Sequence, residues 1–349
     1  MKCTIQNIAD HLGLSRNTVS KALKNSSEVS ENTRNLVIKT ASKLGYKNAT
    51  FATPVIPASE TGSNGTILFL TRTYASDSEF WTTVLRGIES ILSNANYHLA
   101  ISIMSDSDLK QLNFPQTISD SSIKGIILVE ICDKVVCDAL SQFNLPIVSV
   151  DMPNVPFEEL NGIDVVTMES KKNLKKIINQ LIEKGAESFG FVGDLYSPNV
   201  SRGFQERYNA LSECLAEHQL PLNQKNCLLH QTPEDFRNFQ TTVNNLQAMI
   251  SLPDVFICGN DWTAIQLIYA LQFLGFQIPK DICVVGFDNI PAASRISPSL
   301  TTISTPQKYL GIAAARQILE RIQHPNCPHV FCQYETELII RNSTNIIIF

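Results

Sequence analysis

From residue 66 onward, short apolar segments alternate with amphipathic segments, and this alternation constrains the fold more than any other feature of the chain. The apolar segments have the length of buried strands and lie at residues 66–70, 99–104, 125–131, 146–150, 163–167, 189–192, 254–258 and 282–286. Amphipathic segments with helical spacing separate most of them, as at residues 83–94, 171–183, 204–217 and 262–274. Strands that alternate with helices form parallel sheets with helices on both faces. One compact sheet could not hold this many strands with such short loops. We therefore expect an α/β body of two lobes, each a doubly wound parallel sheet, divided near Gly162.

The first 50 residues have a different character, because short helices are predicted there in place of strands. Apolar residues recur at helical spacing in the segment TIQNIADHLGLSRNTVSKAL, residues 4–23. Gly13 ends the first run with a residue that tolerates a positive φ, and Ser15 can cap a second helix. A third helix is expected to begin at Ser30. This order of elements predicts an all-α helix-turn-helix domain over residues 1–47.

Charge is also distributed unevenly between this N-terminal domain and the remainder. Residues 1–50 hold eight basic and three acidic residues, a net charge of +5, whereas the whole chain has −5, which leaves −10 for the other 299 residues. A basic domain on an acidic body is expected if only that domain contacts phosphate. Side chains on the second helix can reach base edges, and the candidates for base contacts are Arg16, Asn17 and Lys21. The candidates for phosphate contacts are Ser15, Thr18, Ser20, Lys24, Ser30 and Thr33.

Composition limits the location and the chemistry of the protein. No apolar run approaches the roughly 20 residues of a membrane span, and the N-terminus has no signal-peptide segment, so we expect a cytoplasmic protein with no membrane contact. Nine scattered cysteines fit a reducing compartment. The segment HPNCPHVFC, residues 324–332, contains zinc-type ligands, but two prolines stiffen it and no second ligand cluster is near. We expect a loop that enters a strand there, and neither a metal nor a cofactor.

The N-terminal pattern resembles a known family. T-I-x-x-I-A-x-x-x-G-x-S-x-x-T-V-S-x-x-L, followed by V-S-x-x-T-R and L-G-Y, is similar to the DNA-binding domain of the lactose-repressor (LacI/GalR) family of bacterial transcription regulators. The match covers residues 4–46, and further matches continue to Arg341. The family usually has a hinge helix with a leucine in the linker, here residues 48–65. This linker contains no leucine, and Pro54 and Pro57 would interrupt a helix, so we expect no hinge helix.

The resemblance also implies how the body, residues 66–349, is divided. The family has a two-lobed, periplasmic-binding-protein-like effector and dimerisation domain whose lobes are joined by three crossovers. Here the crossovers would fall near Gly162, near Ile290 and after the helix at residues 307–322. The first lobe would then hold about residues 66–162 and 291–323, and the second about residues 163–290 and 324–349.

Polar residues follow several predicted strands, where ligands of open α/β sheets bind. Asp151, Asn260 with Asp261, and Asp288 stand at such strand ends, although an Asp there often only caps the next helix. The family signatures add an arginine on the helix after residue 194, and that motif is imperfect. It favours Arg207, with Arg202 as the alternative. The complete effector-site prediction is Phe80, Trp81, Asp151, Arg207, Asn260, Asp261, Asp288 and Thr305.

These features predict a homodimeric repressor of carbohydrate-utilisation genes that binds a palindromic double-stranded DNA operator and responds to a sugar. A nucleobase or nucleoside effector is the alternative ligand. A sugar-active enzyme with a helix-turn-helix domain, using Asp151 and Asp288, is the alternative from another class, but the chain has no G-x-S-x-G, P-loop or H-E-x-x-H motif. A third alternative is a solute receptor for transport. Such a receptor would share the two-lobed body, but the basic N-terminal domain speaks against it. The basic run KKNLKK, residues 171–176, is read as a solvated helix face.

Overall fold

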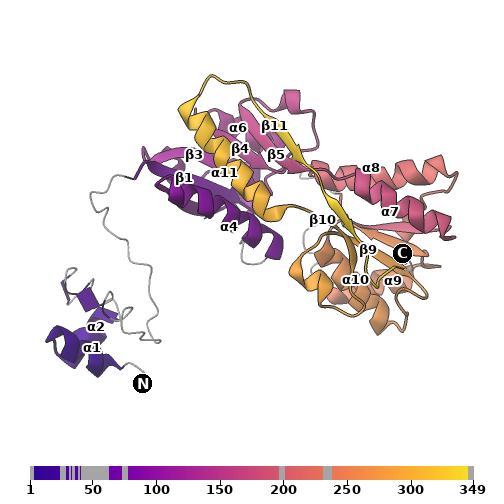
Figure 1. Ribbon diagram of the computed structural model, residues 1–349, viewed down its shortest axis with the longest axis horizontal. Coiled ribbons are helices and arrows are strands. Elements are labelled where there is room, and N and C mark those ends of the chain that lie inside the picture. The colour runs from indigo at the N-terminus through magenta and orange to yellow at the C-terminus, as the bar shows by residue number, and fades with distance from the viewer. Residues whose placement is uncertain are drawn as a thin grey trace. The chain divides into compact units, whose positions relative to one another are not determined.

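The computed structural model describes residues 4–23, 29–30, 33, 36–37, 40, 63–72, 78–195, 201–230 and 238–344. The chain forms two compact units, Met1–Gly62 and Ser63–Phe349 (Figure 1). Lys24, most of the third predicted helix and residues 48–62 of the predicted linker lie outside the described residues. Within the described ranges, no helix is long and apolar enough to cross a membrane.

The N-terminal unit contains the predicted helix-turn-helix, formed by α1 (Ile5–Leu12) and α2 (Arg16–Leu23). Gly13 ends α1 with a φ of 64°, which a residue with a Cβ rarely adopts. The Ser15 hydroxyl accepts a hydrogen bond of 3.0 Å from the Thr18 amide, so Ser15 caps α2. The Ser30 hydroxyl accepts in the same way from the Thr33 amide at 3.3 Å, and the described residues 33, 36, 37 and 40 are helical. Among the described residues of this unit, the small apolar core contains Ile8, Ala9, Val19, Ala22, Val29 and Val37.

The first sheet of the body is parallel and has the strand order β11-β5-β4-β3-β1-β2. Its strands are β1 (Gly65–Thr71), β2 (Tyr97–Ile103), β3 (Ile123–Val129), β4 (Ile147–Val150), β5 (Ile163–Met168) and β11 (Phe331–Tyr334). The helices of this first lobe are α4 (Glu79–Asn94), α5 (Asp106–Gln111), α6 (Lys134–Ser141) and α11 (Gln307–Gln323), with short 3-10 helices at Gln116–Ser119 and Phe157–Glu159.

The second sheet has the order β12-β10-β9-β8-β6-β7 and is parallel except for β12, which pairs antiparallel with β10. Its strands are β6 (Phe189–Asp194), β7 (Leu228–His230), β8 (Val255–Cys258), β9 (Cys283–Asp288), β10 (Thr301–Ser304) and β12 (Glu337–Ile339). The helices of this second lobe are α7 (Lys172–Glu183), α8 (Arg202–Glu217), α9 (Phe239–Ala248) and α10 (Asp261–Phe273), with 3-10 helices at Gln224–Asn226 and Pro291–Ser294. The two-lobed α/β architecture is therefore confirmed.

The predicted lobe boundaries are wrong by one strand at each crossover. Ile163 pairs with Ile147, so β5 belongs to the first sheet, although the boundary near Gly162 placed it in the second lobe. β10 pairs with β9 and stays in the second lobe, whereas β11 pairs with β5 in the first. The chain crosses between β5 and α7, between β10 and α11, and between β11 and β12. Buried strands of both sheets have the same apolar pattern, so the sequence does not show which sheet a strand joins.

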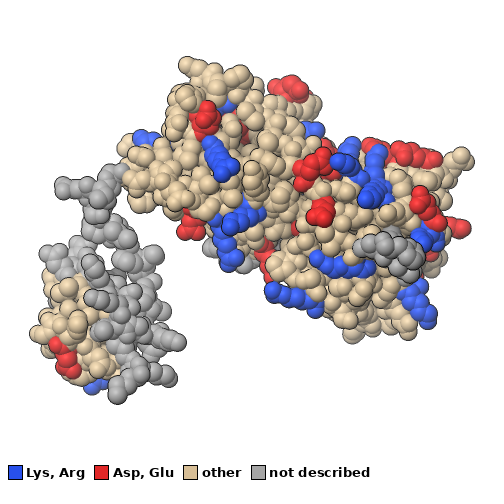
Figure 2. Space-filling model, in the orientation of Figure 1, with Lys and Arg blue, Asp and Glu red and all other residues tan. Residues whose placement is uncertain are grey.

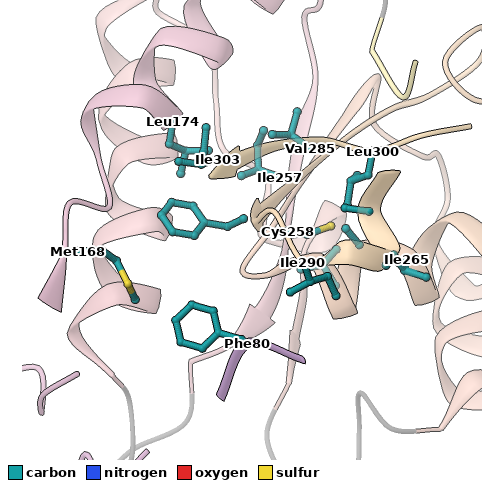
Figure 3. Packing of buried hydrophobic residues seen from close by; sticks show 14 of the residues in the cluster. Phe80, Met168, Leu174, Ile257, Cys258, Ile265, Val285, Ile290, Leu300 and Ile303 are labelled. Carbon is teal, nitrogen blue, oxygen red and sulfur yellow. The ribbon is translucent and has the colours of Figure 1, made fainter. Parts of the chain in front are cut away.

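Two helices from distant parts of the chain, α4 and α11, lie side by side in the first lobe (Figure 1). Glycines allow the close approach: a Cβ on Gly311 would lie 2.0 Å from the Val84 carbonyl oxygen, and one on Gly87 would lie 2.2 Å from that of Lys308. The main apolar core continues from the first lobe into the second, where Phe80 and Met168 face Ile257 and its neighbours (Figure 3). The strand ends of the two lobes are thereby held close to one another.

Candidate functional site

Three strand ends carry acidic residues in an unusual backbone conformation. Glu130 follows β3 with a φ of 58°, Asp151 follows β4 with a φ of 92°, and Asp288 ends β9 with a φ of 115°. Residues other than glycine rarely adopt positive φ, and such residues gather at binding and catalytic sites. Two of these acids come from the first lobe and one from the second.

Asp151 is the first-lobe residue whose charge is coupled to the second lobe. Burial raises the pKa of Asp151 to about 6, against the hydrogen bond from the Met152 amide, the charge of Arg207 and a hydrogen bond from the Ser201 side chain. The Met152 amide donates to Oδ1 at 2.8 Å. Because Arg207 and Ser201 belong to α8 and its cap, the Asp151 carboxyl faces the second lobe.

Arg207 is the cation of this cluster. It is 3% exposed, its Nη1 donates to the Gly259 carbonyl at 2.6 Å, and its guanidinium lies 3.6 Å from the centroid of the Phe287 ring. Burial lowers the pKa of Arg207, and the charges of Asp288 and Asp151 oppose this effect. Its buried Nε has no hydrogen-bond partner among the described residues. A buried donor without a partner has a free-energy cost that a ligand oxygen could remove.

Asp288 completes the cluster from the second lobe. Burial raises its pKa well above the usual value, against the charge of Arg207, and the charges of Asp261 and Asp151 raise it further. Its backbone carbonyl accepts hydrogen bonds from Thr305 Oγ1 at 3.2 Å and from Gln307 Nε2 at 2.6 Å. Thr305 lies between β10 and α11, and its hydroxyl therefore holds the end of β9.

Asp261 and Asn260 make contacts within the second lobe. Asp261 is fully buried, and its carboxylate accepts from the Thr302 hydroxyl at 2.5 Å and from the Ile290 amide at 2.9 Å. Burial raises the pKa of Asp261 to about 7, and these hydrogen bonds lower it. Asn260 caps α10 by accepting from the Thr263 amide at 2.9 Å. Asn260 is thus the cap of α10, whereas Asp261 does not cap this helix but ties its first residue to β10 and to Ile290.

The two aromatic residues predicted for the first lobe pack on one another. Phe80 and Trp81 are 7% and 8% exposed, and their rings meet edge to face at 4.6 Å. Trp81 Nε1 donates to Glu130 Oε1 at 2.5 Å. The sequence reasoning missed Glu130, because it extended the strand at residues 125–131 through this position. The signal was the one that identified Asp151, an acid directly after a buried strand.

The DNA-contact candidates lie mainly along α2. Ser15, Arg16 and Asn17 are exposed at its start, and Thr18, Ser20 and Lys21 are partly exposed. Of the candidates beyond α2, Ser30 is exposed and Thr33 partly exposed. Val19 and Ala22 are buried on the opposite face, so the polar face of α2 is presented outward.

The basic run on α7 has acidic partners. Lys175 Nζ lies 2.6 Å from Glu213 Oε2, and Lys172 Nζ lies 3.1 Å from Glu335 Oε2. Figure 2 shows acidic and basic side chains next to one another in this part of the body. These partners support the interpretation of residues 171–176 as a solvent-exposed helix face rather than as a second nucleic-acid-binding surface.

A chain that combines a helix-turn-helix whose second helix has an exposed polar face with a two-lobed body that has a polar cluster between its strand ends is a DNA-binding regulator that responds to a small effector. Sequence comparison agrees: the profile of "Bacterial regulatory proteins, lacI family" matches residues 4–48, and that of "Periplasmic binding protein-like domain" matches residues 178–344. The chain belongs to the LacI family of bacterial transcription regulators, which are not enzymes. Members of this family bind operator DNA and small effectors.

Relatives match along nearly the whole chain. The HTH-type transcriptional repressor PurR of Photobacterium profundum is 26% identical over 345 residues, 97% of this chain and 98% of that protein. The ribose operon repressor of Haemophilus influenzae is 27% identical over 344 residues, with the same coverage. The structure of the lac repressor dimer bound to operator and the anti-inducer ONPF has a TM-score of 0.67 at 19% identity and covers 99% of both chains. At that identity it supports the fold alone.

Proposed function

We propose that this regulator represses carbohydrate-utilisation genes, binds a palindromic operator as a homodimer and is controlled by a sugar bound between its lobes. The observation that carries the proposal is the cluster of Asp151, Arg207 and Asp288. It offers two carboxyls and one buried guanidinium to a ligand, and the groups come from both lobes. Vicinal hydroxyls can donate to carboxylates and accept from a guanidinium at the same time, which suits a sugar.

In this proposal the effector works by changing how the lobes meet. A ligand that contacts Asp151 on one lobe and Arg207 or Asp288 on the other favours the arrangement in which these groups are close. Such a ligand changes DNA affinity only by its differential affinity for the two arrangements, typically about 1–3 kcal/mol. Phe80, Trp81 and Thr305 line or support the site, while Asn260 and Asp261 fix α10 behind it.

The N-terminal unit supplies operator recognition. Arg16, Asn17 and Lys21 read bases in the major groove, and each good bidentate contact discriminates by about 1–3 kcal/mol. The phosphate contacts fix the register of α2 on the DNA, and they come from Ser15, Thr18, Ser20, Lys24, Ser30 and Thr33. One such unit contacts too few bases for useful specificity, so two units on a symmetric site are required.

The DNA part of the proposal can be tested by fluorescence anisotropy. The probes are labelled duplexes that tile the DNA beside the gene of this chain. Arg16→Ala and Asn17→Ala each remove one contact from each of the two units, so each should weaken binding of the dimer to the tightest duplex at least about 30-fold. Lys172→Ala, on the exposed face of α7, is the matched control and should leave binding unchanged. A stable monomer that binds no duplex above non-specific affinity would overturn the proposal.

The effector part can be tested by a thermal-shift screen of pentoses, hexoses, disaccharides and nucleosides. A ligand at 100 times its Kd stabilises the folded protein by about 2.7 kcal/mol, which such a screen detects. The hit should lose its effect in Arg207→Lys, because lysine cannot replace the planar donor fork. A shift by nucleosides and by no sugar would transfer the proposal to the alternative effector class.

A further inference from the structure

The two lobes also meet next to the effector site, where the start of α8 contacts the segment after β4. The Arg202 amide of the second lobe donates to the Met152 carbonyl of the first lobe at 3.0 Å, and Pro153 and Ser201 form an antiparallel bridge. Asp151 directly precedes Met152. Any movement of this junction therefore moves an effector-site carboxyl relative to Arg207.

The side chain of Arg202 reinforces the junction. Its Nη1 lies 3.8 Å from Met152 Sδ, and its guanidinium carbon lies 5.2 Å from the centroid of the Phe331 ring. Both of these partners belong to the first lobe, and Phe331 is in β11. On its own lobe, Arg202 Nε donates to Glu206 Oε1 at 2.7 Å. Arg202 thus contacts both lobes through one guanidinium.

The helix by itself does not favour an arginine at this position. Arg202 is the first residue of α8, where the helix dipole disfavours a positive charge. Glu206, one turn later, offsets this cost and holds the guanidinium in place. The sequence patterns left Arg202 as an alternative effector ligand, but its contacts point to Met152 and Phe331, whereas Arg207 interacts with Asp151 and Asp288.

We propose that Arg202 is a positioning residue that holds the segment Asp151–Pro153 of the first lobe against α8. It sets the fraction of molecules in which the effector-site groups of both lobes are assembled. The apparent Kd for an effector rises as that fraction falls, so Arg202 tunes the response without contacting the ligand. The link to effector affinity rests on the proposed function, whereas the interlobe contact does not.

One amide reports this contact directly. The first amides of a helix have no partner within the helix, so the protection of the Arg202 amide comes from the Met152 carbonyl. Hydrogen exchange of the full-length protein, resolved by residue with electron-transfer fragmentation, measures it without any ligand. In Arg202→Ala this amide should exchange about 3- to 10-fold faster, while amides in the second half of α8 keep their wild-type rates.

Three further variants make the test specific. Phe331→Leu should speed the same amide by a smaller factor, and adding it to Arg202→Ala should produce no further change. Arg202→Lys retains a cation near the Phe331 ring and should recover part of the protection. Arg295→Ala changes an exposed arginine elsewhere in the second lobe and should have no effect.

Two outcomes would overturn the proposal. Wild-type exchange in Arg202→Ala would show that the side chain does not hold the junction. Faster exchange throughout α8 would show that Arg202 only stabilises its own helix. Because no ligand is used, failure of the sugar screen leaves this result intact, and failure here leaves the proposed effector site intact.

Discussion

Replacing Arg321 with methionine tests how the segment between α11 and β11 of the first lobe is anchored. Arg321 of α11 is 4% exposed and Asp164 of β5 is fully buried. Arg321 Nε and Nη2 donate to the two carboxylate oxygens at 3.0 and 2.8 Å. The guanidinium also donates to the carbonyls of Cys327 and Pro328, and Asp164 accepts from the Val330 amide at 2.8 Å. This ion pair therefore holds the HPNCPHVFC segment that leads into β11.

The expected cost follows from what Arg321→Met leaves behind. The Asp164 carboxylate stays buried and retains the Val330 amide and Gln317 Nε2 as donors, with His329 Nδ1 3.3 Å from Oδ1, while the carbonyls of residues 327 and 328 lose theirs. Removing one partner of a buried ion pair costs about 3–5 kcal/mol of unfolding free energy. Adding Asp164→Asn removes the uncompensated charge and should reduce the loss to about 1–3 kcal/mol.

The pH dependence has a definite sign. Burial raises the pKa of Asp164, but the hydrogen bonds from Arg321, Val330 and Gln317 outweigh it and hold the pKa below its usual value. In the wild type this carboxylate stabilises the fold above the unfolded-state pKa, and the contribution is lost as pH falls through the lower folded-state pKa. Without Arg321 the pKa of Asp164 rises, so the stability gap between variant and wild type should narrow below about pH 5.

Urea unfolding followed by tryptophan fluorescence can measure these effects. The chain has two tryptophans, and a Trp262→Phe background leaves Trp81 of α4 as the fluorescent reporter. Arg321→Met and the double variant are compared with this background at pH 7.5 and at pH 4. A loss below about 1 kcal/mol at pH 7.5, or a gap that widens at the lower pH, would refute the reasoning.

Three other predictions address the remaining parts of the protein. Gly311→Ala places a methyl group 2.0 Å from the Val84 carbonyl oxygen and should cost about 1–3 kcal/mol in urea unfolding. Asp151→Asn removes a carboxyl whose pKa is raised to about 6, so at pH 8 the ligand-free protein should gain about 3 kcal/mol and at pH 4 less than about 1 kcal/mol by thermal unfolding. Val19→Ala opens the small core of the N-terminal unit and should weaken duplex binding without changing urea unfolding of the body. Three results would contradict these expectations. They are wild-type duplex affinity in Val19→Ala, an Asp151→Asn stability gain at pH 4 as large as that at pH 8, and a wild-type free energy of unfolding in Gly311→Ala.

Much of the fold was readable because its signals are local. All eight predicted strands, which correspond to β1 to β6, β8 and β9, lie within about two residues of their predicted positions, since each is a mostly apolar run between loop residues. The predicted strand list lacked β7, β10 and β12, and it held β11 only as the strand that the loop at residues 324–332 was expected to enter. β7 and β12 have only three residues, and β11 is only partly buried, so their apolar pattern is weak.

The candidate site was predictable only in part, because strand-end position does not show where a carboxylate points. Asp151, Asp261 and Asp288 looked equivalent in sequence, yet Asp261 is fully buried against Thr302 and Ile290. The two arginines of α8 also looked interchangeable. Their separation by five residues puts them on different faces of the helix, and only Arg207 interacts with Asp288.

By itself the sequence determined the helix-turn-helix, the α/β class of the body and the strand ends where a ligand would bind, because periodicity, capping and loop residues act over a few positions. Only the tertiary structure decided that β5 and β11 join the first sheet, that Arg202 contacts the opposite lobe, and that Asp164 pairs with Arg321. These pairings join residues far apart in the chain. They depend on which apolar surfaces and which charges come together when the strands and helices pack into the two lobes. No local sequence pattern encodes these long-range pairings.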